Sequence, residues 1–136
     1  MVYEVGNKFI ELVPKVHRDI VLAACWLHDT IEDARLTYND IKSEFSILVA
    51  EIVYALTNEK GRSRKQRANA LYYAGIRDTL HAPFVKMCDR IANVQHSFDS
   101  NYQMFKMYEK ENEDFLYNVR QEGTVMGDYL TGLFNK

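Results

Sequence analysis

The stretch from Ile20 to Leu27 constrains the fold most, because its eight consecutive residues are all apolar. Apolar residues recur at helical spacing along nearly the whole chain, and the period-two alternation typical of strands is not sustained anywhere. A helix that is apolar on nearly every face has to be surrounded by other elements. The sequence therefore predicts an all-α domain with a helix over about 20–32 at its centre.

Prolines and capping residues divide the chain into further helices. Pro14 ends the first of them, and Asp19 is a candidate cap for the central helix. Thr37 and Asp40 have the spacing of a capping box, although Asp replaces the usual Glu or Gln. Pro83 suits the first turn of a helix. Helices are expected over about 2–13, 20–32, 37–44, 46–57, 64–79, 82–98, 101–120 and 125–134.

Length and charge favour one soluble cytoplasmic domain that covers residues 1–136. The formal net charge of −2 provides no global attraction to nucleic acid or to an anionic membrane. The longest apolar run of eight residues is far shorter than the ~20 residues of a membrane helix, and no signal peptide is recognisable. Cys25 and Cys88 lie in apolar helical patterns and are interpreted as buried free thiols. The sequence does not fix the oligomeric state, and a homo-oligomer is compatible with it.

A histidine and three carboxylates follow the apolar run directly, in the order His28, Asp29, Glu32 and Asp33. His28 and Glu32 share one helix face, and Asp29 and Asp33 share the neighbouring one. Solvated acids at a helix end are the simpler interpretation. Acidic groups at a helix C-terminus are opposed by the helix dipole, however, and histidine and aspartate are good ligands for divalent metals. The placement therefore favours a metal site.

A second polar group follows Pro83 and consists of Lys86, Asp89, Asn93 and His96. Their spacing of three, four and three residues places them on one stripe of a helix. Taken alone, this stripe is typical of the solvated face of an amphipathic helix. Together with the first motif, it offers one more carboxylate for a shared metal ion.

These motifs resemble the HD-domain phosphohydrolases, whose fold is an all-α helical bundle. The segments are HDTIED at 28–33, KMCDRIAN at 86–93 and FSILVAEIVYALT at 45–57. The similarity covers roughly residues 1–120 and is closest to the RelA/SpoT-type branch that hydrolyses ppGpp, including its small single-domain members. It implies a cytoplasmic, metal-dependent hydrolase of a guanosine polyphosphate nucleotide, with no nucleic acid and no membrane as partner.

The resemblance also implies roles for the first motif and for Asp89. His28, Asp29 and Asp89 match metal ligands, and the metal of close relatives is typically Mn²⁺. Glu32 and Asp33 match the acidic pair that orients or deprotonates the attacking water. One divalent ion is therefore the expected cofactor.

Substrate contacts are expected from a second set of residues. By resemblance, Asn93 matches a nucleotide-contacting position, and Arg90 matches a structural or phosphate-side one. Lys86 and His96 extend the same polar stripe toward the substrate. Arg64 belongs to a basic patch that suits pyrophosphate, since guanidinium groups fit phosphate oxygens, although a solvated loop explains that patch equally well.

The chain departs from the family at its beginning, where a further metal-binding histidine is expected. By spacing, that histidine falls just before Met1, so an N-terminally truncated form of the family domain is expected. His17 lies in a loop ahead of the central helix and is not expected to replace it. The alternative hypothesis is a degenerate HD domain that binds a nucleotide or a protein without catalysis.

Overall fold

The computed structural model describes residues 1–30, 36–57 and 69–135, with the side chains of residues 29 and 30 outside that description. In these ranges the chain forms helices and connecting turns, and the all-α prediction is confirmed. None of the described helices is both long enough and apolar enough to span a membrane. The helices are α1 (Val2–Lys8), η1 (Ile10–Leu12), η2 (Lys15–His17), α2 (Arg18–Thr30), α3 (Tyr38–Glu44), α4 (Ile47–Thr57), α6 (Ala70–Asp78), α7 (Ala82–Ser100), α8 (Tyr102–Asn118) and α9 (Val125–Leu133).

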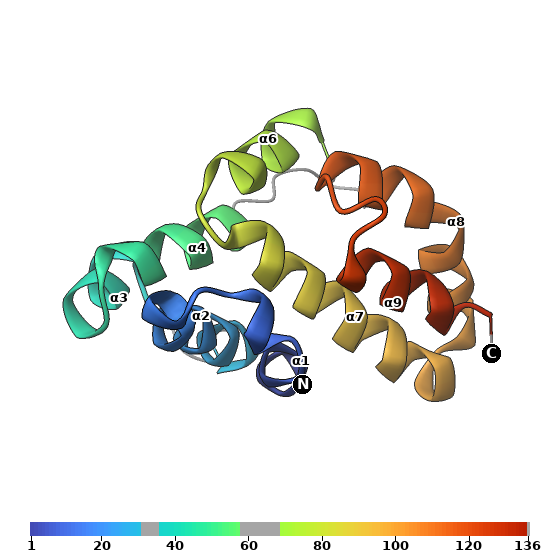
Figure 1. The fold of residues 1–136 in the computed structure, drawn as a ribbon, viewed down its shortest axis with the longest axis horizontal. Helices are drawn as coiled ribbons and strands as arrows, with labels where there is room; N and C mark the ends of the chain where they lie inside the picture. Colours follow the sequence, from blue (N-terminus) through green and yellow to red (C-terminus); the bar gives the residue numbers. More distant parts are fainter. Residues whose placement is uncertain (31–35, 58–68, 136) are drawn as a thin grey trace.

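Helix α7 forms the centre of the molecule. It crosses between the N-terminal helices α1–α4 and the C-terminal helices α8 and α9 (Figure 1). It packs against α1, α2, α4, α6, α8 and α9. The apolar side chains of Val85, Met87, Cys88, Ile91 and Val94 are completely buried in these contacts. The central helix of the fold is therefore α7, which has polar and apolar faces, and not the more apolar helix α2.

This arrangement corrects the prediction that the helix containing Ile20–Leu27 is central. Val21, Ala24 and Cys25 are completely buried, but Trp26 on the opposite face is 50% exposed. Helix α2 packs against α1, α4 and α7 and leaves one side open. Gly6 explains how closely α1 approaches, because a β-carbon there would lie 2.9 Å from the Cys25 sulfur.

Local capping confirms several predicted helix starts. The backbone N–H of Asp40 donates to Thr37 Oγ1 over 3.2 Å, and the backbone N–H of Thr37 donates to Asp40 Oδ2 over 2.9 Å. This reciprocal pair is the expected capping box at the start of α3. Pro83 lies in the first turn of α7, as predicted. The first turn of a helix leaves its N–H groups unpaired, so proline costs no hydrogen bond there.

Three predicted helix boundaries are wrong. The first helix ends at Lys8 and continues as the 3-10 turn η1 instead of running to residue 13. Asp19 lies inside the first turn of α2, because η2 leads directly into that helix, and so it is not the cap. Asn69 has an extended backbone and caps α6 by accepting a hydrogen bond from the Tyr72 N–H over 2.9 Å. The helix predicted over 64–79 therefore begins only at Ala70 within the described residues, and its part over 64–68 lies outside them.

Candidate metal centre

His28 and Asp89 meet where α2 packs against α7. His28 lies in the last turns of α2, and Asp89 lies near the middle of α7. The His28 Nε2 and Asp89 Oδ1 atoms are 3.0 Å apart, although 61 positions separate the two residues in the sequence. The side chains are only 22% and 13% exposed. The buried apolar faces of both helices thus bring the two sequence motifs into direct contact.

Two further residues of α7 bind the same carboxylate. The Asn93 amide Nδ2 donates to Asp89 Oδ1 over 3.1 Å, and the Lys86 ammonium donates to Asp89 Oδ2 over 3.3 Å. We call His28, Lys86, Asp89 and Asn93 the Asp89 cluster. The predicted shared face of Lys86, Asp89 and Asn93 is therefore present. It is not a solvated stripe, since Lys86 is only 8% exposed.

The Asp89 cluster keeps its carboxylate ionised. Burial raises the pKa of Asp89, because a charged carboxylate loses solvation away from water. The hydrogen bond from His28 and the charge of Lys86 lower that pKa by more, so it lies well below its ordinary value. Asp89 is consequently an anion throughout the neutral pH range.

The contact between His28 and Asp89 fits a divalent metal ion. Two ligand atoms at right angles on a six-coordinate ion, each about 2.1 Å from it, lie about 3.0 Å from each other. The Nε2–Oδ1 distance of 3.0 Å has this value, which is also that of the direct hydrogen bond the two groups form here, so the geometry suits either state. An imidazole nitrogen with a carboxylate oxygen is also a donor pair that manganese and other first-row metals accept.

The rest of the predicted ligand set is not placed. Among the side chains that the structure describes, no group of three His, Cys, Asp or Glu residues is gathered around one point. Asp29 follows His28 in α2, but its side chain lies outside the described part. Glu32, Asp33 and Arg64 lie outside the described residues altogether.

The comparisons with known proteins point to one enzyme type. The Danio rerio guanosine-3′,5′-bis(diphosphate) 3′-pyrophosphohydrolase MESH1 is 31% identical over 75 residues, which is 55% of this chain and 42% of that protein. The human MESH1 is 28% identical over 76 residues, or 56% of this chain and 42% of that protein. The Drosophila melanogaster MESH1 is 25% identical over 75 residues, with 55% and 42% covered. This chain is a distant homologue of the MESH1 pyrophosphohydrolases.

The homology confirms the resemblance to small RelA/SpoT-type hydrolases of the HD-domain class. The aligned part spans less than half the length of these curated relatives, at 42% of each. No protein-family model and no solved structure gave a significant match. The homology therefore covers about half of this chain. An assignment of function needs additional support from the geometry of the Asp89 cluster.

Arg90 points away from the Asp89 cluster. Its guanidinium Nη1 donates to Glu111 Oε1 on α8 over 3.1 Å. The guanidinium carbon also lies 4.0 Å from the Phe115 ring centre and 4.8 Å from that of Tyr108. Of the two roles predicted for Arg90, these contacts favour the structural one, because the residue joins α7 to α8.

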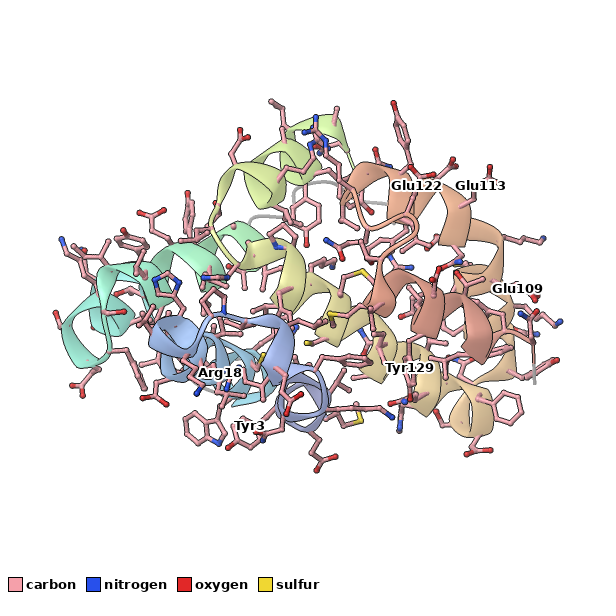
Figure 2. All side chains as sticks on the ribbon, viewed as in Figure 1. Tyr3, Arg18, Glu109, Glu113, Glu122 and Tyr129 are labelled. Atoms are coloured by element: carbon pink, nitrogen blue, oxygen red, sulfur yellow. The ribbon has the colours of Figure 1, made fainter. Side chains whose placement is uncertain are left out.

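His96 is exposed and lies two turns beyond Asp89. It lines a surface hollow of about 390 Å³ between α1, α7 and α9. Tyr129, labelled in Figure 2, lines the same hollow and accepts hydrogen bonds from Lys8 over 3.2 Å and from Gln95 over 3.1 Å. The structure thus places His96 beside these residues and not within the Asp89 cluster.

His17 contacts another histidine and not a residue of the Asp89 cluster. Its Nδ1 atom lies 2.8 Å from His81 Nε2, and the two ring centres are 4.8 Å apart. His81 belongs to no periodic pattern, so nothing in the sequence marked it as a partner of His17. It is the residue just before α7 and has a left-handed backbone with φ of 67°. The expectation that His17 does not complete the metal centre agrees with this pairing.

The two cysteines are buried free thiols, as predicted. A hydrogen bond with Cys25 and burial both raise the pKa of Cys88 far above its ordinary value. A neutral thiol is a poor metal ligand and a poor nucleophile. Cys25 and Cys88 are both completely buried and belong to the packing between α2 and α7.

Proposed function

We propose that this protein is a metal-dependent nucleotide phosphohydrolase that removes pyrophosphate from the 3′ position of guanosine 3′,5′-bis(diphosphate). The observation that carries the proposal is the 3.0 Å contact between His28 and Asp89, which unites two motifs on separate helices. The distant homology to the MESH1 proteins supports the choice of substrate, since these relatives are named guanosine-3′,5′-bis(diphosphate) 3′-pyrophosphohydrolases.

His28, Asp29 and Asp89 are the proposed ligands of one divalent ion, with Mn²⁺ as the expected metal. When bound, such an ion polarises a phosphoryl oxygen and lowers the pKa of a coordinated water. Asn93 holds the Asp89 carboxylate through the 3.1 Å hydrogen bond and so fixes the direction in which its oxygens point. Partners of this kind tune the affinity of the metal ligands that they orient.

Glu32 and Asp33 are the proposed proton acceptors. One of them takes a proton from water as the water oxygen attacks the phosphorus next to the ribose 3′ oxygen. The bond between that phosphorus and the 3′ oxygen breaks, pyrophosphate leaves, and the 3′ oxygen receives a proton. We assign Asn93, Lys86, His96 and Arg64 to the substrate side, and the contacts of Arg90 make it a positioning residue for α7.

The decisive experiment measures hydrolysis of guanosine 3′,5′-bis(diphosphate) with and without Mn²⁺. Pyrophosphate release is expected only with the metal. His28→Ala and Asp89→Ala should each lower the rate by ~100-fold or more, since even residues that merely orient ligands change activity by ~10–100-fold. His17→Gln is the matched control. It also removes an imidazole, but from η2, which leads into α2 and lies outside the Asp89 cluster.

Glu32→Gln and Asp33→Asn separate the chemical step from metal binding. They are expected to slow hydrolysis while Mn²⁺ binding, followed by calorimetry, persists. Nucleotide binding without turnover at saturating Mn²⁺ would instead support the alternative hypothesis of a non-catalytic binding module. An unchanged rate in both His28→Ala and Asp89→Ala would remove the proposed site.

A further inference from the structure

Lys86 is a lysine in an unusual position. Only 8% of the residue is exposed, and lysine is rarely buried to this extent unless a partner balances its charge. Its ammonium group lies 3.3 Å from Asp89 Oδ2 and 5.4 Å from the centre of the Tyr72 ring. The Tyr72 hydroxyl is itself fixed by donating to the Leu56 carbonyl over 3.0 Å. The surroundings of Lys86 thus hold its positive charge against the carboxylate.

Both oxygens of Asp89 are engaged by groups of the protein itself. Oδ1 accepts from His28 and Asn93, whereas Oδ2 accepts from Lys86. A divalent ion between His28 and Asp89 would bind the same carboxylate that already carries the ammonium of Lys86. Two cations on one carboxylate repel each other, and the repulsion is strong in a partly buried site where water screens little.

We propose that Lys86 is a built-in counter-cation that competes with the divalent metal for Asp89, and that a phosphate group of the substrate relieves this competition. The inference rests on the proposed function for the presence of the metal. In the metal-free protein, Lys86 neutralises the carboxylate and keeps the site assembled. With the metal bound, an anionic phosphate adds a negative charge beside the ammonium.

The competition predicts that metal and phosphate bind cooperatively. Without phosphate, the ammonium of Lys86 lowers metal affinity. With phosphate, the anion interacts with both cations, and each ligand therefore raises the affinity for the other by the same factor. Lys86 would then make the metal bind mainly when an anionic substrate is present.

A purely structural role for Lys86 predicts the opposite sign. If Lys86 served only to hold Asp89 in place, its removal would leave a less ordered ligand and weaken metal binding. Competition predicts tighter binding when the charge is removed. The direction of the change in Mn²⁺ affinity therefore distinguishes the two roles.

The test measures Mn²⁺ binding by calorimetry and by the electron paramagnetic resonance signal of free Mn²⁺. The neutral variants Lys86→Met and Lys86→Gln are compared with the charged control Lys86→Arg, with circular dichroism as the check on folding. We expect the Kd for Mn²⁺ to fall by about tenfold in both neutral variants, within the ~5–150-fold range of such couplings, and to change little in Lys86→Arg.

Inorganic phosphate is the second probe, with each titration corrected by a protein-free blank. It should raise the Mn²⁺ affinity of the unmodified protein several-fold and have a smaller effect on Lys86→Met. Weaker or unchanged Mn²⁺ binding in both neutral variants would overturn the inference while leaving the proposed function intact. Absence of Mn²⁺ binding in every protein tested would overturn both.

Discussion

Helix α7 and the residue just before it meet the segment formed by η2 and α2 through two imidazole contacts that differ in their partner. His28 contacts the carboxylate of Asp89 at 3.0 Å, whereas His17 contacts the imidazole of His81 at 2.8 Å. The first contact includes a negative charge and gathers Lys86 around it. In the second, two rings meet edge to face at an interplanar angle of 67° and share a hydrogen bond. The comparison shows that similar geometry gives a contact with a carboxylate in one place and a contact between two imidazole rings in the other.

The electrostatics of the two contacts differ in the same way. Burial, together with the charge of His17, lowers the pKa of His81, so the His81 ring resists protonation. The pKa of Asp89 is lowered by its cationic partners, which favour the charged carboxylate in spite of burial. The surroundings of His81 therefore oppose a charge on that ring, whereas the surroundings of Asp89 stabilise the charged carboxylate.

The largest expected difference concerns the loss of one partner from each contact. Asp89→Ala should lower the free energy of unfolding by about 3–5 kcal/mol, because it leaves the ammonium of Lys86 in a buried place without its carboxylate. His81→Ala should cost only about 1 kcal/mol, the typical value of a hydrogen bond between neutral groups. Urea unfolding of both variants measures the two costs.

The same pair of variants extends the comparison to metal binding. Mn²⁺ should raise the Tm of the His81→Ala protein and of the unmodified protein, but not that of Asp89→Ala, because a ligand stabilises only a fold that binds it. Equal losses of stability in the two variants would show that the charge at Asp89 adds nothing to the contact.

The sequence contained enough local information to predict the elements of the first contact but not its environment. The spacing of Lys86, Asp89 and Asn93 predicted that they lie on one face of a helix. Lys86 and Asn93 do both donate hydrogen bonds to the Asp89 carboxylate. Whether that face is solvated depends on the helices that cover it. Because α7 is surrounded by helices from both ends of the chain, the burial of Lys86 follows from packing that no short pattern specifies.

The second contact was not predictable, because neither histidine lies in a periodic pattern. His17 precedes α2 by way of the turn η2, and His81 adopts a left-handed backbone before α7. Such turns depend on where the adjoining helices are held. The turn η2 also explains the wrong prediction for Asp19. Because η2 leads directly into α2, the helix begins at Arg18, one residue before the expected cap.

The two contacts should lose stability in different pH ranges. The pKa of His81 lies below its ordinary value of 6.5, so below pH 6.5 the unfolded chain takes up a proton that the folded protein resists. The pKa of Asp89 lies below its ordinary value of 3.8, so its contribution is complete above that pH and is lost as the pH falls toward the folded value. Acidification therefore destabilises the fold through His81 first and through Asp89 later.

Urea midpoints measured between pH 8 and pH 3 check the order of these losses. The difference between the unmodified protein and His81→Gln isolates the first loss, because glutamine does not titrate. The curves should separate at high pH and converge as the pH falls below 6.5. Parallel curves across this range would contradict the assignment of that loss to His81.

Removal of one ring from the imidazole pair should have a moderate effect. His17→Gln is expected to cost about 1 kcal/mol of unfolding free energy, since it replaces a ring hydrogen bond that glutamine cannot fully reproduce. Hydrolysis and Mn²⁺ affinity should stay the same, because the Asp89 cluster retains all its residues. A Kd for Mn²⁺ that changed with His17→Gln would show that the two contacts are coupled through α2 or α7.

The smallest effect is expected at the backbone of His81. Its φ of 67° lies in the left-handed region, which glycine adopts without the steric cost that other residues incur. His81→Gly therefore relieves strain while it removes the bond to His17, and the net change should be within about 0.5 kcal/mol of zero. His81→Val, which adds a branched side chain at the same φ, should be clearly less stable.

A double-mutant cycle separates the bond from the backbone. In the His81→Gly protein, a further change of His17→Gln should cost almost nothing, because the bond that His17 makes is already absent. The coupling energy from urea unfolding should therefore equal most of the ~1 kcal/mol assigned to the bond. A coupling near zero would mean that the two rings are neighbours without mutual stabilisation. The start of α7 would then be held by its packing alone, and the charged contact at Asp89 would be the only one of the two to contribute.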